Sequence, residues 1–254
     1  MEVNNKTSIL IIIIIMTLIL MGCSNSKEVI TPEVLTVKAG TTNSDNGNLT
    51  LDYDIKLGKY EVTFAEYIEY CKDTGKVIPD DQGWGRGERP VANVSWFDAV
   101  EYCNWLSKKQ GLSPAYNLTG EKKNWELKDE PQNLAGYRLA TKLEWEYAAR
   151  GGSKGKATTY AGSNKVYEVA WYDFNSDFKT HEVGQKQANE LGLYDMSGNV
   201  WEWTTSLKNS KRMQAGGSYN NVSHYCKIST KHSYNQYSQD PGSDLGFRIV
   251  RTIQ

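Results

Sequence analysis

Three short motifs frame the C-terminal part of the chain: Gly192-Leu193-Tyr194-Asp195-Met196-Ser197-Gly198-Asn199-Val200-Trp201-Glu202-Trp203, Gly216-Gly217-Ser218-Tyr219 and Gly246-Phe247-Arg248. The composition changes between the second motif and the third. Residues 219–239 contain four Tyr, four Ser, three Asn and two His, which together make 13 of the 21 residues. We call residues 219–239 the polar aromatic tract.

The polar aromatic tract has the chemistry of an antibody-like binding loop. Tyr offers a large and rigid amphipathic face, while Ser and Asn supply adaptable hydrogen bonds. The alternative is an ordinary polar surface loop, but such loops are richer in Gly, Pro and Asp. The tract therefore predicts a ligand-binding surface.

The motif order resembles a known family. Upstream of the three motifs stand Tyr137-Arg138-Leu139-Ala140-Thr141 and Glu144-Trp145-Glu146-Tyr147-Ala148-Ala149-Arg150-Gly151-Gly152. Together the five motifs resemble the formylglycine-generating enzyme family, also called sulfatase-modifying factor, over about residues 54–251. The resemblance implies a formylglycine-generating-enzyme-type fold related to the C-type lectin fold. It does not decide the function, because one fold hosts several functions.

Capping signals predict three helices and an irregular α+β fold. Each helix begins after a Ser or Thr that is followed three residues later by an acidic residue, at Thr63 and Glu66, Ser95 and Asp98, and Thr141 and Glu144. Glycines end them, at Gly75, Gly111 and Gly151. A strand is expected over Lys56–Val62, and short strands and turns follow the third helix. Few helices with many short strands indicate the α+β class.

Cysteine usage leaves one question open. Cys71 and Cys103 lie on the apolar faces of the first two predicted helices, where packing in the core is the usual role. A disulfide between them is an alternative that the spacing does not decide.

The N-terminus has the pattern of a lipoprotein signal. An apolar run over 9–20 leads into Leu20-Met21-Gly22-Cys23, which resembles the bacterial lipoprotein cleavage box. We expect residues 1–22 to be a signal peptide, Cys23 to carry lipid, residues 23–50 to be a flexible tether with a short strand near 34–37, and residues 51–254 to form one domain. The expected location is the cell envelope, on the exposed face of the outer membrane.

Calcium is implied at the first motif by the resemblance. The matching family positions, which supply a side-chain oxygen, two main-chain carbonyls and a glutamate, are Asp195, Gly198, Val200 and Glu202. On the residues alone, the alternative is that Asp195 caps a turn and Glu202 pairs with an arginine. We expect a structural calcium ion.

Oxidation chemistry is the family's enzymatic activity, and this chain departs from its pattern. The family enzymes convert a peptide cysteine to formylglycine and hold copper(I) between two thiolates. The matching positions here are Asn221 and Cys226, so one thiolate is missing and we expect no copper. Ser218 and Trp201 match residues near the family's oxygen pocket, and would be catalytic together with Cys226 only if the protein were an enzyme. The three histidines show no spacing typical of an iron site.

The missing thiolate and the polar aromatic tract favour a binding protein. Some proteins of this fold are displayed and diversified by retroelements, with a variable region that corresponds here to about residues 216–248. The predicted ligand-binding residues are Asn220, Asn221, Ser223, His224, Tyr225, Ser229, His232, Ser233, Tyr234, Asn235 and Tyr237. The ligand would be an unknown protein or surface molecule. The net charge of −1 gives no reason to expect nucleic acid. The alternatives are a thiol-directed oxidoreductase and a structural envelope lipoprotein.

Overall fold

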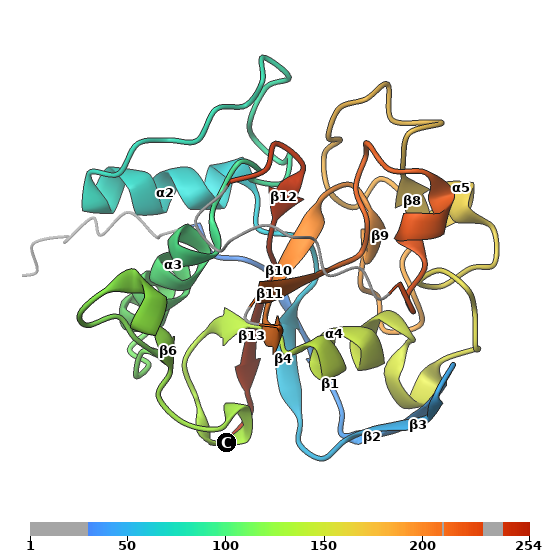
Figure 1. The fold of residues 1–254 in the computed structure, drawn as a ribbon, viewed down its shortest axis with the longest axis horizontal. Helices are drawn as coiled ribbons and strands as arrows, with labels where there is room; N and C mark the ends of the chain where they lie inside the picture. The colour runs from blue at the N-terminus through green and yellow to red at the C-terminus, as the bar shows by residue number, and fades with distance from the viewer. Residues whose placement is uncertain (1–29, 210, 231–240) are drawn as a thin grey trace, which may run out of the picture.

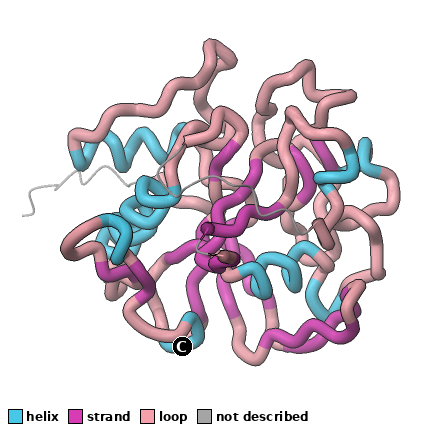
Figure 2. Tube along the Cα trace, viewed as in Figure 1, coloured by secondary structure: helices cyan, strands magenta, loops and turns pink. Residues whose placement is uncertain are grey.

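The computed structural model describes residues 30–209, 211–230 and 241–254, and it confirms the α+β class. Short strands cross the middle of the molecule, with helices on both sides and long loops between them (Figures 1 and 2). The helices are α2 (Phe64–Thr74), α3 (Trp96–Lys109), α4 (Lys142–Ala149) and the single turn α5 (Val166–Val169). The 3-10 turns are η1 (Lys122–Asn124), η2 (Pro131–Asn133), η3 (Gly152–Lys154) and η4 (Ser223–Cys226).

A four-stranded antiparallel sheet joins the two ends of the domain. Its order is β1 (Val34–Val37), β4 (Ile55–Gly58), β13 (Ile249–Thr252) and β7 (Arg138–Leu139). The last strand lies inside this sheet, with Val250 opposite Leu57 on one side and opposite Arg138 on the other. The strand that follows Gly246-Phe247-Arg248 is therefore fixed in the core.

A three-stranded sheet brings the first and third motifs together. Its order is β11 (Lys211–Ala215), β10 (Trp201–Lys208) and β12 (Leu245–Gly246). β12 runs parallel to β10, with Trp201 opposite Leu245 and Glu202 opposite Gly246. Both ends of the intervening chain are thus attached to the same strand.

Three two-stranded sheets complete the fold. They pair β2 (Gly40–Ser44) with β3 (Gly47–Leu51), β5 (Tyr116–Asn117) with β6 (Glu126–Leu127), and β8 (Ala170–Trp171) with β9 (Ser197–Gly198). One apolar cluster lies around α2 and α3 and a second around α4, on opposite sides of the sheets in Figure 1. Within the described residues no helix is both long and apolar enough to cross a membrane.

All three predicted helix starts are confirmed. Thr63, Ser95 and Thr141 each accept a hydrogen bond from the backbone of the third residue onward, and the acidic side chain there bonds back. Gly75 ends α2 with φ 73°, a left-handed conformation that glycine adopts without strain. The three cysteines of the described residues are free and buried, so Cys71 and Cys103 form no disulfide.

The structure revises the predictions for the N-terminal part. The expected strand over 56–62 ends at Gly58, where an added Cβ would lie 3.0 Å from the Tyr60 carbonyl oxygen, because the chain turns there. The short strand expected near 34–37 is confirmed as β1, which pairs with β4. The segment around it was expected to be a flexible tether, but β2 and β3 form a hairpin there. Residues 23–29, with Cys23, lie outside the described residues.

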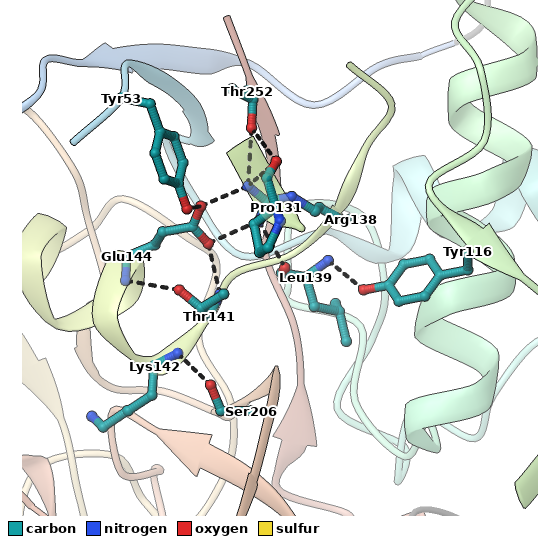
Figure 3. A network of polar contacts seen from close by, with 10 residues as sticks. All are labelled: Tyr53, Tyr116, Pro131, Arg138, Leu139, Thr141, Lys142, Glu144, Ser206 and Thr252. Atoms are coloured by element: carbon teal, nitrogen blue, oxygen red, sulfur yellow. Dashed lines mark hydrogen bonds and ion pairs between the residues drawn. The ribbon is translucent and has the colours of Figure 1, made fainter. Parts of the chain in front are cut away.

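A buried ion pair explains the Tyr137–Thr141 motif (Figure 3). The Arg138 guanidinium donates to both carboxylate oxygens of Glu144 at 2.6 and 2.8 Å, and neither side chain is exposed. Glu144 also accepts from the Tyr53 hydroxyl and from the Thr141 backbone. Burial alone would raise the pKa of Glu144, but Arg138 and these hydrogen bonds outweigh burial and hold the pKa below its usual value.

We expect this pair to shape acid unfolding. Because the folded-state pKa of Glu144 lies below its unfolded value near 4.5, the pair contributes stability above that pH and loses it as the pH falls. Glu144→Gln should cost about 3–5 kcal/mol at neutral pH, because it leaves Arg138 buried and unpaired. The difference between wild type and variant should then shrink below about pH 4.5. Urea unfolding between pH 3 and 7 measures both, and a pH-independent difference would contradict the assignment.

Candidate functional site

The described part of the polar aromatic tract contains both buried and exposed residues. Tyr219, Cys226 and Ile228 are buried. The exposed residues are Asn220, Val222 and His224, and the half-buried ones are Asn221, Ser223, Tyr225, Lys227, Ser229 and Thr230. The predicted ligand residues His232, Ser233, Tyr234, Asn235 and Tyr237 lie outside the described residues. Buried positions thus fix the path of the segment that carries exposed side chains.

Tyr225 differs from the other predicted ligand residues. Its ring packs against the core cluster around α2 and α3 and makes an edge contact with His224, with ring centroids 5.7 Å apart. Ser229 instead lines a polar cavity of about 280 Å³ beside the β2–β3 hairpin. Among the described ligand candidates, Asn220 and His224 have the most exposed side chains.

The position that would hold the first copper thiolate is occupied by an engaged amide. The Asn221 side-chain oxygen accepts from the Ser218 backbone at 3.0 Å and lies 2.9 Å from the Ser218 hydroxyl oxygen. The same hydroxyl lies 2.8 Å from a carboxylate oxygen of Asp244, whose pKa is raised by burial. Ser218 therefore ties the start of the tract to the segment before β12.

The remaining thiol is a core residue. Cys226 is fully buried, and a Cβ added to Gly217 would lie 2.9 Å from its sulfur. Burial raises the pKa of Cys226 to about 12, so the thiol stays protonated at neutral pH. One protonated thiol and one amide oxygen do not fit copper(I), which prefers two thiolates. Trp201, the other residue named for catalysis, is buried in the core cluster around α2 and α3.

The histidines are dispersed. His181 stacks on Trp171, with centroids 3.8 Å apart, and burial lowers its pKa. His224 is exposed, and His232 lies outside the described residues. Across the described ranges, no three His, Cys, Asp or Glu side chains are placed to hold a metal ion together.

The candidate calcium residues fit an ion only in part. Asp195 is buried, and its Oδ2 accepts from the Gly184 backbone, while Oδ1 has no hydrogen-bond partner among the described residues. Glu202 already has other partners. Both its carboxylate oxygens accept hydrogen bonds from Arg248 at 2.7 Å, and one also accepts a hydrogen bond from the Trp145 indole at 2.8 Å. These hydrogen bonds compete with a calcium ion for the Glu202 carboxylate.

A third buried carboxylate belongs to this group and was missed by the sequence analysis. Glu61 accepts from the Asn199 amide at 2.7 Å and from the Val200 backbone at 3.1 Å. Burial, and then the charges of Asp195 and Glu202, raise its pKa well above the usual value. Burial likewise raises the pKa of Asp195 to about 6. In the sequence, Glu61 is a single glutamate in a strand-like pattern, and nothing there predicts that it is buried near Asp195 and Glu202.

Calcium therefore stays a prediction, centred on Asp195. An ion bound only by the folded state would raise the melting temperature by mass action. We expect chelation to lower Tm in wild type and to have no effect in Asp195→Asn, which keeps the side-chain shape and removes the charge. Differential scanning fluorimetry with chelator, excess calcium or excess magnesium is the measurement. Equal Tm in chelator and in calcium would rule the site out.

Two further loops meet the start of the tract. The Asp173 backbone N–H donates to the Asn221 carbonyl at 3.1 Å, and the Ser176 hydroxyl donates to the Tyr219 carbonyl at 2.7 Å. Trp84 makes an edge contact with the Tyr219 ring, with centroids 5.2 Å apart. These loops, 81–88 and 173–178, lie in the upper half of Figure 1, away from the β2–β3 hairpin at the bottom. We call residues 81–88, 173–178 and 219–225 the loop platform.

Comparisons with known proteins settle the family. The family model described as sulfatase-modifying factor enzyme 1-like domain matches residues 22–253. The chain belongs to this family. The match confirms the resemblance seen in the motifs and extends to the strands that precede residue 51.

Relatives within the sulfatase-modifying factor family differ in function. The chain is 35% identical to the chaperone protein LppX of Paenibacillus barcinonensis, over 92% of this chain and 94% of that protein. It is 29% identical to the mouse (Mus musculus) formylglycine-generating enzyme over 68% of this chain, but spans only 46% of that enzyme. The solved structure of Treponema denticola variable protein 1 superposes with a TM-score of 0.71 at 28% identity, covering 87% of this chain and 95% of the other.

Proposed function

We propose that this protein is a non-enzymatic, ligand-binding member of the sulfatase-modifying factor family. One observation carries the proposal: the family's thiolate pair is replaced by the engaged amide of Asn221 and the buried, protonated thiol of Cys226. The likeness to a chaperone protein and to a variable protein supports binding rather than oxidation.

The proposed binding face is the loop platform together with the rest of the tract. Its backbone is held by the Asp173–Asn221 and Ser176–Tyr219 hydrogen bonds, so exposed side chains such as Asn220 and His224 project from a fixed surface. A preorganised surface loses less conformational entropy on binding. We propose a protein ligand, lipid attachment at Cys23, and display from the outer membrane. We propose that residues 216–248 vary, and a template repeat near the gene would be the evidence for it.

The oxidoreductase alternative makes a distinct prediction. An enzyme of the family's type would bind copper(I) and oxidise a peptide cysteine in the presence of oxygen. We expect neither from this protein, because Cys226 is buried in the core and Asn221 stands where the other thiolate would be. Copper(I) competition titration and mass spectrometry of a cysteine-containing peptide test this. Copper-dependent loss of the thiol would contradict the proposal and favour the enzyme.

Binding itself is tested by selection from a displayed library of random peptides on the wild-type protein. We expect recovery of peptides that bind with affinities of roughly micromolar order, corresponding to about −8 kcal/mol. Failure to enrich any sequence would favour the third alternative, a structural envelope lipoprotein.

A further inference from the structure

Two of the most exposed aromatic side chains of the described residues lie on one loop of the loop platform. Phe174 is 85% exposed and Phe178 is 63% exposed. Apolar side chains of this size are normally found in the core or at an interface, where they contribute much of the binding energy. The tract neighbour Val222, 51% exposed, adds a third apolar side chain to the same platform.

The loop is held rigidly although its phenylalanines bury little. Ser176 is fully buried, and its hydroxyl oxygen accepts from the Phe178 backbone while its proton goes to the Tyr219 carbonyl. The Asn175 side chain accepts from Tyr172 and donates to the Ala170 carbonyl. Buried polar side chains thus anchor the loop, and the Phe174 ring adds a stacked contact with Tyr172, with centroids 6.2 Å apart.

Phe178 also sits in an unfavourable backbone conformation. Its φ is 54°, and that of the preceding Asp177 is also 54°. Left-handed backbone in bulky residues other than glycine costs free energy and persists where the surroundings impose it, often at functional sites. Burial of the Phe178 ring does not offset this cost in the free protein, because most of the ring is exposed.

Acidic residues next to Phe174 and Phe178 favour a partner that carries positive charge. Asp173 and Asp177 directly precede the two phenylalanines. Lys179 lies 3.8 Å from Asp177, but such an exposed pair is weak and leaves the carboxylate available. A partner with a cationic group beside its apolar group would complement this pattern.

We infer that the 173–178 loop is the aromatic half of the protein-binding face, and that it receives a segment of the partner protein carrying apolar side chains next to Lys or Arg. The inference rests on the proposed binding function. It adds anchors that lie outside residues 216–248, so they would be the same whatever sequence the tract carries. The loop would then bind a feature that all partners share, and the polar aromatic tract would discriminate among these partners.

The test measures binding of the library-selected peptides to Phe174→Ser/Phe178→Ser. We expect affinity to fall at least about 30-fold, as for central aromatic anchors. The matched control is Val77→Ser/Leu207→Ser, which removes two apolar side chains that are 89% and 57% exposed and lie outside the platform. It should bind as wild type does. We also expect the selected peptides to be enriched in apolar residues beside Lys or Arg.

Phe178→Gly separates a binding role from a structural one. Glycine relieves the left-handed strain and little buried area is lost, so Tm should equal or exceed that of wild type while peptide affinity falls. A Tm several degrees lower would make Phe178 a structural residue and overturn the inference.

The remaining outcomes are distinguishable. Unchanged peptide affinity in the double phenylalanine variant, with loss in Asn220→Ala/His224→Ala, would overturn the inference and leave the proposed function intact. Loss in neither variant would place binding elsewhere and contradict both. If the phenylalanine variant keeps peptide binding but loses binding to vesicles of phosphatidylcholine and phosphatidylglycerol, the loop contacts a membrane instead.

Discussion

Arg248→Met should be the most damaging single substitution in the frame of the binding face. Arg248 is a buried cation that interacts with three buried carboxylates, those of Glu61, Asp195 and Glu202. Its guanidinium also donates to the carbonyl oxygens of Gly58 and Tyr194 at 3.0 and 2.9 Å. Removing one partner of such a buried pair costs about 3–5 kcal/mol. That loss is a large share of the 5–15 kcal/mol typical of a whole domain.

Urea unfolding at neutral pH measures this loss. Arg248→Lys should recover only part of it, because an ammonium cannot donate the two parallel bonds that Glu202 accepts. Adding Glu202→Gln to Arg248→Met should also recover part, since one uncompensated charge is then removed. A loss below about 1 kcal/mol in Arg248→Met would mean that the carboxylates are neutralised by another group.

Phe247→Ala should also cause a large loss, and it should act on stability rather than on recognition. Phe247 is fully buried, with its ring 5.4 Å from that of Tyr102 and 6.3 Å from that of Tyr67, centroid to centroid. Truncating such a ring leaves a cavity and costs about 3–5 kcal/mol. The same substitution at exposed His224 should change stability by no more than about 0.5 kcal/mol.

Thermal and urea unfolding of the two variants, side by side, measure this contrast. Similar losses in both would mean that the tract is part of the core and not a binding surface. Tyr225→Ala should fall between them, because its ring is half-buried against the core cluster around α2 and α3.

The helices were predictable because their signals are local. A capping residue and its acidic partner three positions later act within one turn, so Thr63, Ser95 and Thr141 mark helix starts without reference to the rest of the chain. The β2–β3 hairpin was missed because the Thr, Asn and Ser residues of β2 lack an alternating apolar pattern. The local signals for the pairing are the Asn46-Gly47 dipeptide at the turn and the alternation of Leu49 and Leu51 in β3.

The candidate site was predictable only in part, because the burial and exposure of its residues depend on contacts between distant segments. Motif matching located Asn221 and Cys226, but the burial of Cys226 depends on the close approach of Gly217. Apolar residues are assigned to the core by default, so Phe174 and Phe178 gave no sign of lying on the surface. The loop that exposes them is held by one hydrogen bond from Ser176 to Tyr219, a residue 43 positions away.

If exposed side chains on the loop platform bind a protein ligand, Asn220→Ala/His224→Ala should bind the library-selected peptides more weakly. Isothermal titration, with Tm measured beside it, tests this. We expect a loss of about tenfold or more, equivalent to about 1.4 kcal/mol, with Tm unchanged. Affinity equal to that of wild type, in a variant that melts as wild type does, would contradict it.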